Sequence, residues 1–253
     1  MKALFAVITA LASLPMFAAD DVLIVADEHP AMQYVAGKLK SEENKTVQVV
    51  WQTNLPPDLS VYSAVLMYIH RDLKEDAEKA LINYAEGGGK LIVLHHSISS
   101  GKRKNRDWFK FLGVTLADAE VNAGGYKWIE DISQQIVNLN AKHFITTHKV
   151  SYPEKIPFKP DLQGEEQSRP AVTLNKSEVY LNHVLTEDKT RTTLLGFKYT
   201  DKDSGKTWMQ THAGWVKPSG KGWVIYLQPG HSLHDLQNPT YERILLNALI
   251  WKP

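Results

Sequence analysis

The sequence predicts an α/β protein built on a doubly wound, mainly parallel sheet. Two observations support this prediction: short apolar runs typical of buried strands alternate with amphipathic segments, and one of these runs follows a glycine turn and ends in two histidines. A helix between two strands returns the chain to the same edge of a sheet, so strand–helix–strand units give parallel strands with right-handed connections. The first hundred residues contain two such units.

The first half of the chain is predicted to alternate between strands and helices. The helix after the third strand places Ala77, Leu81 and Tyr84 on one face and stops at glycines, which favour the conformation that closes a helix. A later helix has a similar glycine stop at Gly113. Strands are predicted at residues 21–27, 46–52, 63–70 and 90–96, and helices at residues 31–42, 73–89 and 106–118.

The middle of the chain has weaker patterning. Residues 124–128 and 151–170 are predicted to form long, ordered loops broken by short strands, and loops of that length usually build a site or a lid. Regular patterning then returns towards the end of the chain. The predicted elements there are strands at residues 177–185, 192–200, 207–216 and 222–231, followed by an amphipathic helix at residues 239–251 that begins at Pro239.

Residues 1–19 have the pattern of a secretory signal peptide. One cationic residue, Lys2, precedes an apolar run too short to span a bilayer, and small residues follow before Asp20. We therefore expect cleavage after Ala18 or Ala19 and a single mature domain at residues 20–253, located in the periplasm or secreted. An uncleaved anchor or a buried first strand is the alternative interpretation.

Composition argues against several function classes. The sequence has no cysteine, so no disulfide framework, thiol nucleophile or thiolate metal ligand is available. Removal of residues 1–19 subtracts Lys2 from the 29 basic residues and leaves 28, equal to the 28 acidic residues, so net charge gives no case for a nucleic-acid or membrane partner. The basic cluster at residues 101–106 is interpreted as a solvated loop or, alternatively, as an anion or substrate contact.

Histidines gather at the predicted strand ends, where ligands bind in open parallel sheets. The segment GGGKLIVLHHS at 87–97 delivers two of them. Because alternate strand residues point to opposite faces, one member of that pair is expected to face the ligand. The candidate catalytic residues are His95, His96 and His231, and the candidate substrate-binding residues are Asp27, Glu28, His29, His70, Arg71, Tyr126, Trp128 and His234.

Imidazoles at such an edge suit three kinds of chemistry: proton transfer near neutral pH, metal ligation and hydrogen bonding to hydroxyl groups. No spacing of His, Asp and Glu matches a specific metalloenzyme motif, so no metal or other cofactor is expected. Ser97 follows the histidine pair, but the chain lacks a GxSxG motif, which disfavours a serine nucleophile. Tyr126 and Trp128 can stack on a sugar ring, with core packing as the alternative.

Four segments together resemble the ThuA-like (trehalose utilisation) family: GGGKLIVLHHS, DWFKFLG, SEVYLNHV and GWVKPSGKGWVIYLQPGHSLHDLQNPTYERILLNALIW. The resemblance implies a class I glutamine amidotransferase-like fold, a flavodoxin-like three-layer sandwich with a mainly parallel sheet. In the amidotransferases a nucleophilic cysteine follows a glycine-led strand, and here His95 holds that place. The amidotransferase histidine after a late strand resembles His231. Without a cysteine, amidotransfer by that mechanism is excluded.

The family's association with trehalose, related disaccharides and their keto forms implies a small-molecule carbohydrate as the partner. Our first hypothesis is an enzyme that acts on a carbohydrate or keto-sugar through histidine acid/base chemistry. A non-catalytic glycan-binding module and a metal-dependent hydrolase are the alternatives. The predicted signal peptide favours an extracytoplasmic sugar or sugar derivative over trehalose itself.

Overall fold

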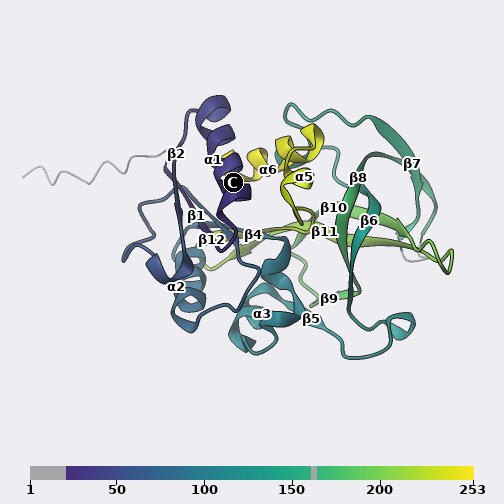
Figure 1. Cartoon of the computed structure of the whole chain (residues 1–253), viewed down its shortest axis with the longest axis horizontal. Coiled ribbons are helices and arrows are strands. Elements are labelled where there is room, and N and C mark those ends of the chain that lie inside the picture. Colours follow the sequence, from purple (N-terminus) through teal and green to yellow (C-terminus); the bar gives the residue numbers. More distant parts are fainter. Residues whose placement is uncertain (1–20, 161–163) are drawn as a thin grey trace, which may run out of the picture.

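One large sheet runs through the molecule and divides into a parallel half and an antiparallel half (Figure 1). The computed structural model describes residues 21–160 and 164–253, so the predicted signal peptide lies outside the described residues. Within those described ranges the sheet has ten strands. The predicted α/β class is therefore correct, but the sheet is mixed.

The parallel half contains the strand–helix–strand units predicted from the sequence. Its strands are β1 (Asp21–Ala26), β2 (Thr46–Val50), β3 (Ala64–Tyr68), β4 (Lys90–Leu94) and β12 (Gly222–Leu227). Their order, β2-β1-β3-β4-β12, is the order of flavodoxin-like sheets, in which ligands bind at the switch between the first and third strands. Strands β3 and β4 are buried throughout, because helices cover both faces.

Helices on the two faces make the parallel half a three-layer sandwich. One face carries α1 (His29–Glu43), α5 (Leu233–Leu236) and α6 (Pro239–Ile250), and the other carries α2 (Glu75–Glu86) and α3 (Arg106–Leu112). Alternate strand residues divide between two hydrophobic clusters, one shared with α1 and α6 and the other with α2 and α3. The short apolar runs and amphipathic segments of the sequence thus account for this half.

The antiparallel half replaces the continuation of the parallel sheet that the sequence predicted. Its strands are β6 (Lys127–Asn138), β7 (Glu154–Phe158), β8 (Gln167–Leu181), β10 (Thr192–Thr200) and β11 (Thr207–Ser219). The complete order is β2-β1-β3-β4-β12-β11-β10-β6-β8-β7. The prediction of a mainly parallel sheet is wrong here because consecutive strands, such as β10, β11 and β12, pair as antiparallel neighbours without crossover helices.

Two long strands, β6 and β8, lie in the weakly patterned middle of the chain and overlap the predicted loops at residues 127–128 and 167–170. In β6, Asp131 has a φ of 55°, and the register with β8 shifts between Ile129 and Ile132. In β8, Lys176 has a φ of 52°. Such bulges interrupt the period-two alternation that identifies a strand in a sequence. They explain why the sequence predicted no strand over most of β6 or over the first part of β8.

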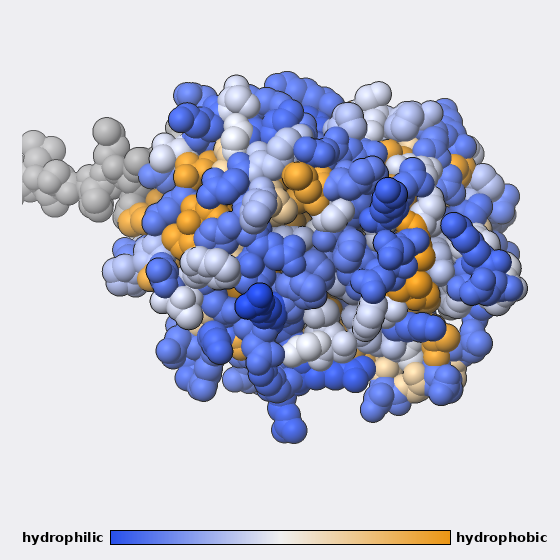
Figure 2. Space-filling view, in the orientation of Figure 1, coloured by the Kyte–Doolittle hydropathy of each residue, from blue (hydrophilic) through white to orange (hydrophobic). Residues whose placement is uncertain are grey.

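Short elements complete the described part of the chain. β5 (Val114–Leu116) pairs with β9 (His183–Leu185) in a separate two-stranded sheet, and α4 (Phe144–Thr147) lies against α6. The 3₁₀ helices are Gln52–Asn54, His95–Ile98, Ser100–Lys102 and Val121–Ala123. Among the described residues, no helix is both long and apolar enough to cross a membrane. The face drawn in Figure 2 is largely hydrophilic, with small, separate hydrophobic areas.

Candidate active site

Strand β4 ends in a strained turn that carries two buried histidines. His95 has a φ of 47°, a left-handed conformation that non-glycine residues rarely adopt, and it opens the 3₁₀ helix His95–Ile98. The side chains of His95 and His96 are 0% and 4% exposed. Because the chain leaves the extended conformation here, both imidazoles lie together, with ring centroids 4.1 Å apart. The expectation that only one of the pair faces the site is therefore wrong.

A glutamate from the antiparallel half completes the site. The buried carboxylate of Glu178, in β8, places Oε2 at 2.9 Å from His95 Nε2 and at 2.9 Å from His231 Nδ1. His96 Nε2 lies 3.7 Å from the same oxygen. We name these four residues the histidine–glutamate cluster; one ligand atom from each lies within 4.8 Å of the others. The cluster joins the ends of β4 and β12 to the interior of β8.

Contacts inside the cluster set its charges. Burial acts to raise the pKa of Glu178, but the contacts with His231 and His95 outweigh burial and lower it to about 2. The hydrogen bond with Glu178 raises the pKa of His231. Burial, reinforced by the imidazoles of His95 and His70, holds the pKa of His96 well below its usual value. At neutral pH the cluster therefore contains an ionised glutamate beside a neutral His96.

The loop after β12 is held under the cluster by polar contacts. His95 Nδ1 contacts the backbone carbonyl of Gln228, which follows β12 directly. Oδ2 of the buried Asp235 accepts hydrogen bonds from the backbone N–H groups of Gly230 at 3.2 Å and His231 at 3.1 Å. These contacts fix the imidazole of His95 against the loop that carries His231.

Residues after β1 and β3 form a rim beside His96. His70 stacks on His96 with ring centroids 4.0 Å apart, and its Nδ1 lies 2.8 Å from Glu28 Oε1. Asp27 accepts hydrogen bonds from the backbone N–H groups of His70 at 2.8 Å and Arg71 at 2.7 Å. Both oxygens of Asp27 are engaged, so this carboxylate positions the loop after β3, while the side chains of Glu28, His70 and Arg71 are available at the rim.

Two predicted aromatic residues lie beside the cluster, next to Tyr180 of β8. Tyr180 stacks on His95 at a centroid distance of 4.9 Å, and Tyr126 lies 6.0 Å from Tyr180. The register pairs Trp128 directly with Tyr180, so the two side chains leave the sheet on the same face. Trp128 is 49% exposed. The alternative of core packing is therefore wrong for Trp128, and its predicted role in binding a ligand stays a prediction.

Two predicted site residues lie outside both the histidine–glutamate cluster and the rim and aromatic residues beside it. His29 stacks on Trp51, after β2, with ring centroids 4.4 Å apart. His234 is exposed on α5, whereas its neighbour Asp235 is buried. His29 lies three residues after β1 and His231 four residues after β12, so distance from a strand end alone did not separate the histidines that join the site from those that do not.

The basic segment at residues 101–106 is partly buried beneath the rim. Lys102 is 0% exposed and its Nζ donates a hydrogen bond to the backbone carbonyl of His70 at 2.7 Å. Burial lowers the pKa of Lys102 to about 8. Lys104, in contrast, is exposed and lies 2.5 Å from Asp72. The interpretation as a solvated loop holds for Lys104, whereas Lys102 supports the loop that carries His70.

Sequence reasoning missed Glu178 and Tyr180. The predicted strand at residues 177–185 contains both. Glu178 is the one Asp, Glu, Lys or Arg residue in that segment. A charge within a strand that is predicted to be buried requires a partner, because an unpaired buried charge is costly. That signal could have identified Glu178 as a functional candidate, although not its histidine partners.

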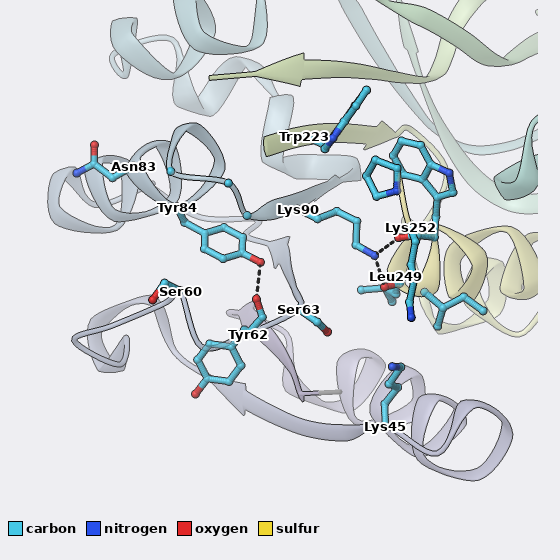
Figure 3. Close-up of a pocket in the computed structure, with 16 residues that line it drawn as sticks. Lys45, Ser60, Tyr62, Ser63, Asn83, Tyr84, Lys90, Trp223, Leu249 and Lys252 are labelled. Atoms are coloured by element: carbon cyan, nitrogen blue, oxygen red, sulfur yellow. Dashed lines mark hydrogen bonds between the residues drawn. The ribbon is translucent and has the colours of Figure 1, made fainter. Parts of the chain in front are cut away.

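The opposite end of the parallel strands has a different character. A cavity of about 500 Å³ lies at the amino end of β4, and Lys90 extends into it (Figure 3). Lys90 Nζ donates hydrogen bonds to the backbone carbonyls of Leu249 at 2.7 Å and Trp251 at 2.5 Å, at the end of α6. Polar side chains at this end thus satisfy backbone groups, whereas those of the histidine–glutamate cluster face one another.

The sequence matches the family model for ThuA, described as trehalose utilisation, over residues 21–252. The chain belongs to the ThuA family. Membership of the ThuA family indicates a carbohydrate-related role. No curated protein matches the chain in sequence.

Solved structures similar to this ThuA-family chain share its fold at low sequence identity. A ThuA-like protein from Bacteroides uniformis has 17% identity and a TM-score of 0.65, covering 96% of this chain and 95% of that chain. The cytoplasmic protein STM1381 from Salmonella typhimurium has 14% identity and a TM-score of 0.58, covering 90% of this chain and 98% of that chain. A β-galactosidase from Bacillus circulans sp. alkalophilus has 10% identity and a TM-score of 0.53, covering 89% of this chain and 30% of that chain.

His95 occupies a sharp turn at the end of β4. A left-handed φ at His95 is combined there with the 3₁₀ helix that follows. The chain has no cysteine, so the side chain offered at this turn is an imidazole and no thiolate can act here.

Proposed function

We propose that this ThuA-family protein acts on a carbohydrate or keto-sugar at the histidine–glutamate cluster, with histidine side chains as acid and base. The observation that carries the proposal is the convergence of three imidazoles on the buried Glu178 carboxylate. The cluster lies at the carboxyl edge of the parallel strands, where ligands bind in this class of fold. Imidazole is the side chain best suited to proton transfer near neutral pH.

His231 is the side chain best placed to exchange a proton with the ligand. Its imidazole is 25% exposed, whereas those of His95 and His96 are 0% and 4% exposed. Glu178 contacts Nδ1 of His231, which leaves Nε2 for proton transfer. In this proposal Glu178 is a positioning residue for His231, and His95 and His96 form the floor of the site.

A keto-sugar suits this arrangement chemically. A carbonyl group acidifies the neighbouring C–H bonds, so an imidazole base can remove a proton there, and the hydroxyl groups of the sugar need hydrogen-bond partners. At the rim, Glu28, His70 and Arg71 supply those partners. Tyr126 and Trp128 supply aromatic surface for the apolar face of a sugar ring.

The test is product analysis with oxidised and unoxidised disaccharides. Purified mature protein is incubated with trehalose, related disaccharides and their keto derivatives, and the products are separated by chromatography. We expect one keto-sugar to be consumed, and we expect His231→Gln to lower the rate by at least about 100-fold, the usual contribution of a general acid or base. His148→Gln is the matched control, because His148 stacks on Phe144 outside the cluster.

A glycan-binding module without catalysis is the second candidate, favoured by the exposed ring of Trp128 beside Tyr180. Calorimetry with the same sugars separates the two candidates. Binding without any product after long incubation supports the binding module and contradicts the enzyme. Turnover that is equal in wild type and His231→Gln also contradicts the proposed role of His231.

We also propose that the protein is exported, with removal of residues 1–19. The support is the sequence pattern alone: one lysine, a short apolar run and small residues before Asp20. Mass spectrometry of the protein recovered from a periplasmic extract or the culture medium tests this. A chain that begins at Ala19 or Asp20 supports export, and a chain that is found inside cells with Met1 intact contradicts it.

A further inference from the structure

His95 stands between two hydrogen-bond acceptors. Its Nδ1 contacts the backbone carbonyl of Gln228, so Nδ1 carries a proton, while its Nε2 lies 2.9 Å from the Glu178 carboxylate. A neutral imidazole has a single N–H, so a neutral His95 turns the lone pair of Nε2 towards a carboxylate oxygen. A cation bound to both atoms would accept that lone pair together with the carboxylate oxygen.

His96 offers a second nitrogen in the same place. Neither of its ring nitrogens has a hydrogen-bond partner among the described residues, although the side chain is only 4% exposed. Buried polar atoms are hydrogen-bonded in the great majority of cases, so two unpartnered nitrogens need an explanation. An imidazole nitrogen with a free lone pair is the commonest metal ligand among side chains.

We propose that His95, His96 and Glu178 bind a divalent transition-metal ion, with zinc(II) as the best-matched ion. Two imidazoles and one carboxylate form a ligand set that zinc uses in catalytic sites, where a remaining position stays open. Tetrahedral bonds of about 2.0–2.2 Å place neighbouring ligand atoms about 3.4 Å apart. Glu178 Oε2 lies 2.9 Å from His95 Nε2 and 3.7 Å from His96 Nε2, distances on either side of that value.

The surroundings of these ligands have the features of a metal site. Histidines that bind metal ions usually donate their other N–H to a carbonyl or carboxylate, and His95 does so to the carbonyl of Gln228. Carboxylate ligands are likewise hydrogen-bonded, and His231 Nδ1 lies 2.9 Å from Glu178 Oε2. His231 has no lone-pair conflict, because its Nδ1–H can donate to Glu178. We therefore assign it to orientation and proton transfer, not to ligation.

A second group of residues at the rim also includes His96. Ligand atoms of Glu28, His70 and His96 lie within 4.8 Å of one another. Glu28 and His70 are 39% and 57% exposed and lie 2.8 Å apart as a hydrogen-bonded pair. Their polar atoms are satisfied by each other and by solvent, whereas neither ring nitrogen of His96 has a partner among the described residues. The ion is therefore placed on the buried side of His96.

The inference deepens the proposed function and rests on it for the identity of the substrate, but metal binding is measured without any sugar. A zinc ion at this position acts as a Lewis acid on a sugar carbonyl or hydroxyl oxygen. His231 remains beside it as the group that gives or takes the proton. Because His231 carries the proton, the ligands His95, His96 and Glu178 need not change their protonation states.

The experiment begins with untagged wild-type protein. Elemental analysis of the protein as purified, calorimetric titration of chelator-treated protein with zinc chloride, and the visible spectrum after cobalt(II) addition are measured. We expect about one equivalent of zinc per chain and cobalt bands of a low-coordinate nitrogen–oxygen site. Less than about a tenth of an equivalent, no titration heat and no cobalt bands would together overturn the proposal.

Variants locate the ion. We expect Glu178→Gln and His96→Asn each to weaken zinc binding by more than about 100-fold, whereas His148→Gln binds as wild type does. His231→Gln removes only a hydrogen-bond partner of a ligand, so we expect it to weaken zinc binding by about 10-fold. Zinc binding that is unchanged in both ligand variants, or lost equally in His231→Gln, contradicts the three-residue ligand set. Circular dichroism of each variant checks that it is folded, and the wild-type titration stands if one is not.

The outcomes separate the two proposals. Zinc binding that depends on Glu178 and His96, without conversion of any sugar, supports the metal site and contradicts the proposed function. Conversion of a sugar at an unchanged rate by chelator-treated protein that takes up no zinc contradicts the metal site and leaves the proposed function intact.

Discussion

The two halves of the sheet deliver functional side chains in different ways. In the parallel half, His70, His95 and His231 belong to loops that begin where β3, β4 and β12 end. In the antiparallel half, Glu178 and Tyr180 belong to the carboxyl-terminal part of β8 itself, which is paired with β6, and both side chains are buried. Parallel topology alone brings the carboxyl ends of these strands to one edge of the sheet. A strand interior reaches the same place only when its register with neighbouring strands is correct.

The two halves therefore contribute different chemical groups to the site. The parallel half supplies neutral or cationic imidazoles, and the antiparallel half supplies the carboxylate and the tyrosine that contact them. Neither half has the cluster without the other. Variants that weaken the contact between the halves should therefore show how far the site depends on their joint assembly.

The largest effect is expected from Asp235→Asn. Oδ2 of Asp235 accepts hydrogen bonds from Ser177 Oγ of β8 at 2.7 Å and from the backbone N–H groups of Gly230 and His231 after β12. This carboxylate therefore ties the two halves together. Hydrogen bonds to charged groups contribute about 1.5–3 kcal/mol, so the free energy of unfolding should fall by about 2–3 kcal/mol in a urea titration.

Ser177→Ala is the matched variant, because it removes the donor from β8 and leaves the two backbone bonds of the parallel half. We expect a smaller loss, about 1 kcal/mol, in the same titration. Equal stability of wild type and Asp235→Asn would mean that the halves are joined by packing alone. A loss in Ser177→Ala as large as that in Asp235→Asn would place the whole contribution on the antiparallel side.

A smaller effect is expected at the other end of the parallel half, from Lys90. Burial, with the charges of Lys45 and Lys252 acting in the same direction, lowers the pKa of Lys90 to about 7 from an ordinary value of 10.5. Between those two pH values the unfolded chain binds more protons at Lys90 than the folded chain does. The free energy of unfolding therefore rises with pH across this window, by at most about 1.4 kcal/mol per pH unit from this group.

Urea titrations of wild type and Lys90→Met between pH 7 and pH 10 measure this contribution. The slope with pH should be smaller in the variant, and the difference isolates Lys90 because the other buried lysines are common to both proteins. A variant slope equal to that of wild type would show that Lys90 keeps its ordinary pKa in the folded protein. The histidine–glutamate cluster should be unaffected by the titration of Lys90 or by Lys90→Met, since Lys90 lies at the opposite end of β4.

The sequence was a sound guide to the parallel half and to the strand at residues 192–200, which matches β10. Local patterns suffice there, because a buried parallel strand is a continuous apolar run and a crossover helix is amphipathic. The predicted strand at residues 207–216 likewise matches β11, but β6 and the first part of β8 were missed, because bulges at Asp131 and Lys176 break the strand pattern there. Glu178 escaped for a related reason: its partners lie 53 and 83 residues away, and only the register of β8 brings them together.

The place of β12 in the sheet has a consequence for the growing polypeptide. β12 lies between β4 and β11, so both of these strands have an unpaired edge until residues 222–227 have been synthesised. Unpaired edges of buried apolar strands invite pairing with other chains. A polypeptide released before this point would lack His231 and would be prone to aggregate, so premature termination yields material for degradation instead of a partially active protein.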